Sequence, residues 1–131
     1  GVGDVIHLRK LMESRPFFTR IPAPEFIADD EVRSSVPGAG RYHFTATMDS
    51  EGTYAMVYAP VGRKFSVRTD MLKASRLKAW WYSPRTGKAD RIGTFENKGG
   101  VIEFTPPHIG EALDWVLILD DASMKYPVPG K

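Results

Sequence analysis

The chain has 131 residues and a mass of 14.6 kDa, the size of one domain, since domains most often contain roughly 100 to 150 residues. Apolar residues make up 42% and charged residues 26%, which excludes a disordered tail, and the absence of cysteine excludes disulfides and thiolate chemistry. The formal net charge is +2 with both signs interspersed, so nothing in the charge indicates nucleic acid or an anionic membrane as a partner.

The segment before Pro16 predicts one short amphipathic α-helix. Asp4 is placed to be its N-cap, and the helix should end near Ser14, because Arg15 precedes a proline and is pushed out of the helical region. The segment begins without methionine or the charged and apolar regions of a signal peptide, so we expect a piece of a longer protein. Apolar residues recur at helical spacing at Val5, Ile6, Leu8, Leu11 and Met12.

Residues 16–41 predict an extended connector. Proline and glycine recur throughout, and an acidic cluster lies at residues 29–31. Phe26 and Ile27 form a short apolar pair in this stretch, where we expect an edge strand.

Residues 42–131 predict a β-sandwich, because short β-like runs alternate with turn signals at intervals of about ten residues. The fold class is therefore all-β, an antiparallel two-sheet β-sandwich of about seven to eight strands preceded by one short N-terminal α-helix. The predicted strands are residues 42–48, 53–59, 64–69, 77–83, 89–95, 101–105 and 115–120.

Turn residues predict how these strands are joined. Residues 49–52, 83–87 and 98–100 contain glycine in the positions that hairpin loops require. Residues 70–73 predict a single helical turn with Asp70 as its cap. The runs 53–59 and 115–119 carry apolar side chains on both faces, so we expect the helix or a neighbouring domain to cover the outer face.

No catalytic, metal or cofactor site is predicted. The three histidines fall in a helix, a strand and a loop without shared spacing, and the acidic runs at residues 29–31 and 120–121 lack the spacing of a calcium loop. The sequence also lacks a nucleophile elbow, a phosphate-binding loop and a dinucleotide fingerprint. Solvated loops and strand ends are the simpler interpretation of the acidic runs.

Consecutive aromatic residues form the candidate binding site. Trp80, Trp81 and Tyr82 lie on one predicted strand, so Trp81 should point opposite to the other two, and Arg85 follows in the next turn. One face of this strand should be core, and the other is a candidate platform for a sugar ring or a protein surface. The alternative is that protein covers both faces. Trp115 is predicted to be a core residue.

Four ordered motifs carry a family resemblance. They are AMVYAPVGR at residues 55–63, AWWYSPRTG at 79–87, FTPP at 104–107 and DWVLILD at 114–120. Together they closely resemble the family named "putative collagen-binding domain of a collagenase", the C-terminal domain of apiosidase-like glycoside hydrolases, which follows a TIM-barrel catalytic domain. The stretch HLRKLMESRP at residues 7–16 is similar to the segment that joins barrel to sandwich in those proteins.

The resemblance implies a domain organisation and a function. Residues 1–15 would be the helix and the connection to a missing catalytic domain, residues 16–41 the connector, and residues 42–131 the sandwich. We expect a non-catalytic accessory domain of a glycoside hydrolase, secreted or periplasmic, that packs on and stabilises its TIM-barrel partner. The catalytic carboxylates would belong to the barrel, and the substrate would be a plant-type polysaccharide. The alternative is a module that binds carbohydrate or collagen-type protein through Trp80, Trp81, Tyr82 and Arg85.

Overall fold

The computed structural model describes residues 2–38 and 40–131 of the chain. Helix α1 (Val2–Glu13) comes first, followed by β1 (Arg20–Pro22), β2 (Thr45–Asp49), β3 (Tyr54–Ala59), β4 (Phe65–Arg68), β5 (Arg76–Ser83), β6 (Lys88–Glu96), β7 (Val101–Phe104) and β8 (Trp115–Asp121). Short 3₁₀ turns are η1 (Pro24–Phe26), η2 (Asp30–Val32), η3 (Gly40–Tyr42), η4 (Thr69–Met71) and η5 (Ala122–Met124). The accessible surface is 6916 Å², close to the roughly 6,900 Å² that area scaling gives for a folded chain of this mass.

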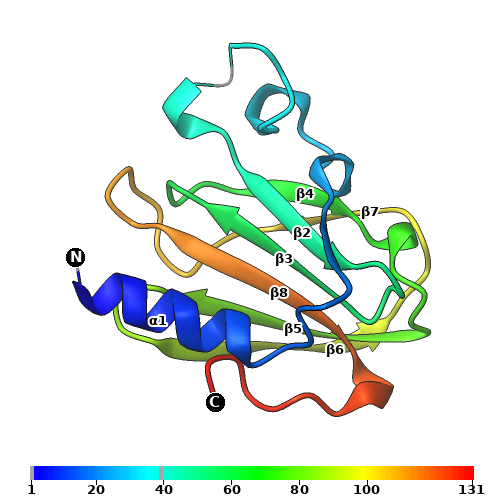
Figure 1. Cartoon of the computed structure of the whole chain (residues 1–131). Helices are drawn as coiled ribbons and strands as arrows, with labels where there is room; N and C mark the ends of the chain where they lie inside the picture. Colours follow the sequence, from blue (N-terminus) through cyan, green and yellow to red (C-terminus); the bar gives the residue numbers. More distant parts are fainter. Residues whose placement is uncertain (1, 39) are drawn as a thin grey trace.

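The strands form two antiparallel sheets, which confirms the predicted fold class. The larger has the order β1-β2-β3-β8-β5-β6, and the smaller pairs β4 with β7 (Figure 1). The central strands β3 and β8 are those whose sequence is apolar on both faces. No helix in the described part of the chain is long and apolar enough to cross a membrane.

The inner face of the larger sheet packs against the smaller sheet. Its buried side chains alternate along each strand with those of the outer face, as the two-residue period of a strand requires. We call this buried cluster the inner core. It includes Val57, Phe65, Leu77, Trp81, Phe104, Trp115, Leu117 and Leu119.

Helix α1 covers part of the outer face of the same sheet, as predicted (Figure 1). Leu11 is fully buried against the sheet, with Leu8 and Met12 half-buried beside it, whereas Val5 is 68% exposed. The helix begins at Val2, so the prediction of Asp4 as its N-cap is wrong. Asp4 lies instead in the first turn, where a carboxylate stabilises the helix dipole.

The stretch predicted as a connector supplies part of the inner core. Ala23, Phe26, Ile27 and Val32 are all buried in it. The edge strand lies at β1 rather than at Phe26 and Ile27, because Pro24 starts the 3₁₀ turn η1 and turns Phe26 into the core. Ile27 keeps only an isolated bridge to Val67.

Residues 98–100 do not form the predicted hairpin. They carry the chain from β6 in the larger sheet to β7 in the smaller one. The amide group of Asn97 donates hydrogen bonds to the carbonyls of Thr69, Leu72 and Ala74, which fixes this crossover against η4. The predicted helical turn is confirmed as η4, but its N-cap is Arg68 and not Asp70.

Candidate docking face and binding residues

The candidate binding strand is buried on both faces. Trp80, Trp81 and Tyr82 are 8%, 4% and 1% exposed. Trp81 points into the inner core, edge-on to Phe65 and Trp115 with ring centroids 5.9 and 6.3 Å away. The predicted opposite orientation is confirmed, since Trp80 and Tyr82 lie on the outer face.

The prediction that protein covers both faces of this strand is confirmed, because α1 lies over the outer face. Trp80 and Tyr82 are buried together with Leu11 of the helix. The Tyr82 hydroxyl donates a hydrogen bond of 2.7 Å to the carbonyl of His7 in α1. Burial raises the pKa of this hydroxyl. Sugar stacking on this strand would therefore require the helix to move.

Arg85 holds the loop in front of β8. Its guanidinium donates to the Asp114 carboxylate at 3.1 Å and to the Asp114 carbonyl at 2.9 Å, and it lies over the Trp115 ring at 4.7 Å from the centroid. The hydroxyl of Tyr58 donates to the same carboxylate at 3.0 Å. Burial, followed by the charge of Asp114, raises the pKa of Tyr58 to about 12. Of the four candidate residues, Arg85 alone keeps a partly exposed side chain, at 28%.

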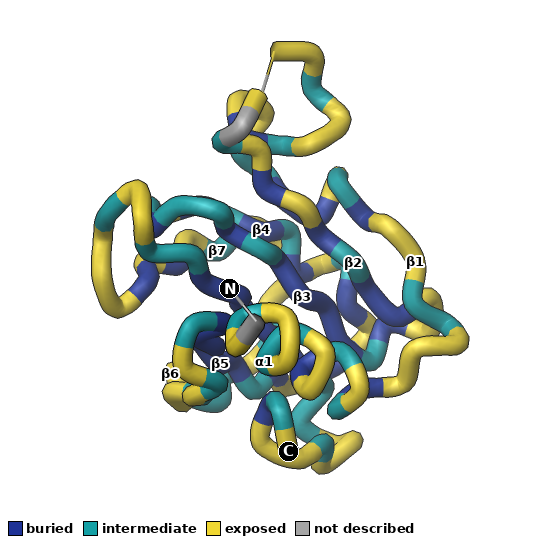
Figure 2. The backbone as a smooth tube through the Cα atoms, turned by 60° about the vertical axis from the view of Figure 1, so that its left-hand side comes forward, coloured by how far each residue is buried: buried dark blue, intermediate teal, exposed yellow. Residues whose placement is uncertain are grey.

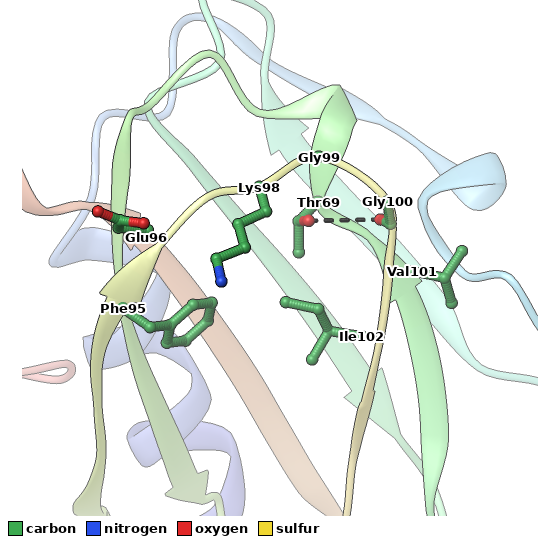
Figure 3. Close-up of a pocket in the computed structure, with 8 residues that line it drawn as sticks. All are labelled: Thr69, Phe95, Glu96, Lys98, Gly99, Gly100, Val101 and Ile102. Carbon is green, nitrogen blue, oxygen red and sulfur yellow. Dashed lines mark hydrogen bonds between the residues drawn. The ribbon is translucent and has the colours of Figure 1, made fainter.

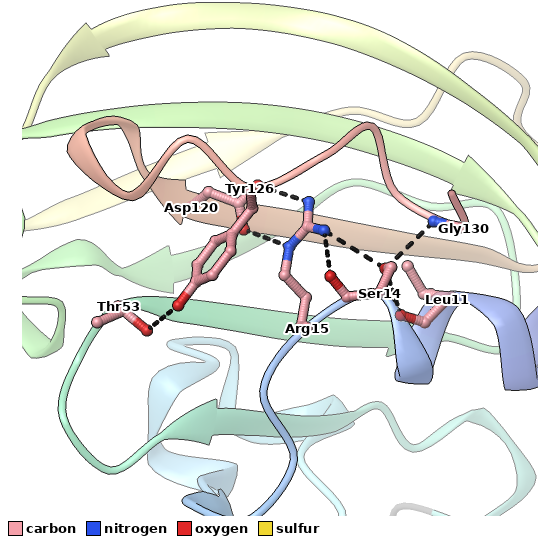
Figure 4. A network of polar contacts seen from close by, with 7 residues as sticks. All are labelled: Leu11, Ser14, Arg15, Thr53, Asp120, Tyr126 and Gly130. Carbon is pink, nitrogen blue, oxygen red and sulfur yellow. Dashed lines mark hydrogen bonds and ion pairs between the residues drawn. The ribbon is translucent and has the colours of Figure 1, made fainter.

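A buried ion pair fixes the end of α1 to strand β8 (Figure 4). Arg15 donates to both carboxylate oxygens of Asp120, at 2.9 and 2.8 Å, and its side chain is fully buried. The guanidinium also lies over the Tyr126 ring, 5.1 Å from the centroid. Burial raises the pKa of Asp120, and the contact with Arg15 opposes that rise.

Further hydrogen bonds extend this pair into a network, which we call the junction network. Arg15 donates to the carbonyl of Ser14 at 2.9 Å, and the Ser14 hydroxyl donates to the Leu11 carbonyl at 2.6 Å. The backbone N–H of Gly130 donates to the Ser14 hydroxyl at 3.2 Å. The hydroxyl of Tyr126 lies 2.8 Å from that of Thr53. The network therefore joins α1, β8 and the C-terminal segment.

An apolar groove of about 270 Å³ lies between α1 and the outer face of β2 and β3. We call it the α1 groove. The helix leaves β2 uncovered on this side, so the half-buried Leu8 and Met12 of the helix and Tyr58 of the sheet border open solvent. The groove is lined by Leu8, Leu11 and Met12 of the helix and by Thr45, Thr47, Met56, Tyr58 and Val116 of the sheet.

Exposed apolar side chains concentrate in α1 and in the segment that follows it. Ten large apolar residues of the described chain are exposed, and five of them fall between residues 5 and 21. Phe18 is 93% exposed, and its ring lies 4.5 Å from that of Phe17. The five residues are Val5, Ile6, Phe17, Phe18 and Ile21.

A second cavity, of about 490 Å³, lies at the crossover from β6 to β7 (Figure 3). Phe95 and Ile102 form its apolar wall, and Lys98 extends along it. The Thr69 hydroxyl donates to the Gly100 carbonyl at 3.3 Å, which closes one end. Among the described residues, no group of three His, Cys, Asp or Glu is placed to hold a metal ion.

The junction network and the α1 groove were not predicted from the sequence. One signal for the network was present, because Asp120 has the same strand parity as Val116 and Ile118 and so belongs to the outer face. A buried carboxylate is stable only when it is paired with a cation or hydrogen-bonded. Arg15, two residues after the end of α1, provides that cation. The groove depends on which part of the sheet the helix leaves uncovered, which no local pattern encodes.

Comparisons with known proteins place this fold. The chain matches two solved chains over nearly its whole length: one described as a glycoside hydrolase, with TM-score 0.78 and 32% identity over 92% of this chain, and a glycoside hydrolase family 5 protein from Bacteroides vulgatus ATCC 8482, with TM-score 0.80 and 29% identity over 95%. This chain spans only 25% of each of those chains. No curated protein matches. Residues 21–120 match a family model, and because this is more than half of its length, the chain belongs to the family described as "putative collagen-binding domain of a collagenase".

Proposed function

We propose that this domain is a non-catalytic accessory domain of a glycoside hydrolase that packs on and stabilises the catalytic barrel of the same protein. The observation that carries the proposal is that the two solved chains described above are glycoside hydrolases about four times as long as this chain. The remaining three-quarters of such a chain are sufficient for a TIM barrel, which typically has about 250 residues. The expectation of an extracellular or periplasmic location belongs to the same proposal.

The use of three buried or half-buried carboxylates supports a structural role. Asp120 is paired with Arg15, and Asp114 binds Arg85 and Tyr58. Asp49 accepts hydrogen bonds from the hydroxyls of Thr19 and Thr53. Glycoside hydrolysis uses two carboxyl groups that face each other across a cleft. These three carboxylates instead hold separate parts of the fold together.

The inclusion of part of α1 in the matches to the solved relatives supports packing through the N-terminal part. The family model starts at residue 21 and omits the helix. The match to the Bacteroides protein covers 95% of this chain and leaves out about seven of its 131 residues, fewer than the 12 of α1. At least part of the helix is therefore kept with the sandwich in a glycoside hydrolase.

Truncation of the full-length protein tests the proposal. We expect removal of residues 1–131 to lower the melting temperature of the catalytic domain by several degrees, because the barrel loses a packed partner, while the catalytic residues stay in place. Calorimetry and the rate of glycoside hydrolysis at low temperature measure the two effects. An unchanged melting temperature would contradict the packing role. A loss of kcat from a point mutation in this domain, with melting unchanged, would contradict its non-catalytic role.

The alternative function, binding of polysaccharide or extracellular protein on the Trp80 to Tyr82 strand, has less support. The rings that would stack on a ligand are covered by α1 or by the smaller sheet. Retention of the domain on polysaccharide or collagen, lost on Arg85→Ala without loss of folding, would support this alternative over packing alone.

A further inference from the structure

We propose that the catalytic domain docks on the α1 groove and on the exposed apolar side chains of α1 and the segment after it. Apolar side chains of the catalytic domain would occupy the groove. This inference rests on the proposed function, since it assigns the surface through which the two domains pack. It goes further in naming the residues that become covered.

The first observation is that α1 is apolar on more than one side. Leu11 is fully buried against the sheet, whereas Val5 is 68% and Ile6 is 47% exposed. A helix at the surface of a single domain normally has one apolar stripe and a polar opposite face. Apolar residues on a second side are typical of a helix that lies between two packed bodies.

The second observation is the continuity of the helix with the groove. Val5, Leu8 and Met12 are three and four residues apart, so they follow one side of α1. Leu8 and Met12 form one wall of the α1 groove, and the exposed Val5 lies one turn further along the same side of the helix. The opposite wall includes Thr45 and Thr47 on the outer face of β2, which lies beside the helix and is not covered by it (Figure 2).

The third observation is that the groove is held rigidly. The junction network ties the end of α1 to β8 through a fully buried Arg15. The Tyr54 hydroxyl donates to the carbonyl of Pro16 and accepts from Arg20 at 2.8 Å, which fixes the segment after the helix. Both walls of the groove are therefore set before a partner binds, which lowers the entropy cost of docking.

The catalytic domain is favoured over a second copy of this chain as the occupant. Residues 5–21 contain five of the ten exposed large apolar side chains of the described chain, yet residues 2–20 lie outside the matched family region. A glycoside hydrolase four times as long retains at least part of the helix. An apolar helix that relatives keep together with a large additional domain is explained by contact with that domain.

Thiol labelling in the full-length protein tests this surface. The domain has no cysteine, so an introduced thiol is its only one. Thr45→Cys places the thiol in the α1 groove, and Thr105→Cys places a matched thiol after β7 in the other sheet. Both threonines are exposed in this domain, so an uncovered groove gives equal reaction rates. We expect Thr45→Cys to react with a bulky maleimide at least about 10-fold more slowly than Thr105→Cys, since it reacts only when the domains separate.

Peptide mass spectrometry assigns the label to this domain, and unfolding in urea should equalise the two rates. Equal rates in the native protein would overturn the proposed surface. If truncation nevertheless destabilises the catalytic domain, the packing role stands and another face docks. If truncation has no effect either, both proposals fail. Protection of Thr45→Cys that disappears on dilution would identify a second copy as the occupant and also overturn the proposal.

Discussion

The inner face of the larger sheet packs against a second sheet, whereas its outer face packs against a single helix. The inner core contains 21 buried apolar residues, three times the seven of the cluster that joins the outer face to Leu11 of α1, which we call the outer layer. The inner core is held by apolar and edge-to-face aromatic contacts such as those between Trp81, Phe65 and Trp115. The outer layer also depends on polar contacts at its edges. Two tyrosine hydroxyls donate hydrogen bonds to backbone carbonyls, and Arg15 forms an ion pair with Asp120.

The difference reflects how much of each face is covered. A sheet that covers another sheet excludes water from many side chains at once, so burial alone stabilises the arrangement. One helix of 12 residues covers only a stripe, and it needs directional bonds to fix its position. The outer layer therefore combines limited burial, a buried charge pair and an open groove. The open groove and the limited burial agree with the proposal that another domain completes this surface.

The largest effect is expected from Trp81→Ala, which removes the centre of the inner core. Loss of a buried Trp side chain costs about 3 to 5 kcal/mol, because the cavity left behind closes only partly. Trp80→Ala should cost less, since α1 can move toward the sheet and fill part of the space. Urea unfolding of the domain measures both. A larger loss for Trp80→Ala would contradict the view that the inner core carries most of the stability.

The next effect is expected from Arg15→Met, which breaks the junction network. It leaves the buried Asp120 carboxylate without its cation, at a cost of about 3 kcal/mol near pH 7. Burial raises the pKa of Asp120, and loss of Arg15 removes a contact that opposes the rise. The ionised form is then disfavoured in the folded state, so the loss should shrink as the pH falls toward about 4, where the carboxyl is protonated.

The double variant Arg15→Met/Asp120→Leu provides the control. It removes both charges, so most of the stability that Arg15→Met loses should return. The pH dependence of that loss should disappear as well, because no carboxyl group is left at position 120. Thermal unfolding of the two variants between pH 4 and 8 makes the comparison, with these pH limits set at about the ordinary carboxyl pKa and above neutrality. A deficit of Arg15→Met that does not change with pH would show that lost packing, and not the buried charge, causes it.

The inner core could be predicted from the sequence because period-two alternation fixes which side chains share a face. All seven expected strands are present, and Trp81 and Trp115 lie in the core as predicted. Alternation does not specify strand partners. The glycines at residues 99 and 100 suit a hairpin as well as a crossover, and here β6 stays the edge strand of the larger sheet while β7 pairs with β4.

The outer layer could be predicted only in part. The apolar outer faces of β3 and β8 predicted that something covers them, and α1 does so. The position of the helix follows from long-range bonds between Arg15 and Asp120 and between Tyr82 and His7, which local periodicity does not encode. The sequence therefore did not determine whether Trp80 is exposed, and the structure shows that the helix buries it.

A smaller effect is expected from Asp49→Asn at the end of β2. Burial alone would raise the pKa of Asp49, but hydrogen bonds from Thr19, Thr53 and backbone N–H groups outweigh it and lower the pKa from 3.8. The ionised carboxylate thus stabilises the fold above its ordinary pKa, and this contribution is lost as the pH falls through the lowered value. The asparagine variant should lose about 1 to 2 kcal/mol at pH 7 and show a weaker acid dependence of melting. Equal acid dependence in both proteins would contradict this role.

The smallest effect on the domain itself is expected from Phe18→Ser on the proposed docking surface. Its side chain is 93% exposed, and apart from the Phe17 ring it has little protein around it to lose. The free energy of unfolding of the 131-residue domain should therefore change by no more than about 0.5 kcal/mol. Leu11→Ala, on the buried side of the same N-terminal region, is the matched control and should cost about 2 to 5 kcal/mol.

In the full-length protein Phe18→Ser should instead lower the melting temperature of the catalytic domain, because the ring would be covered there. A loss above about 1 kcal/mol in the isolated domain would mean that Phe18 already packs within the sandwich, and would remove it from the docking surface.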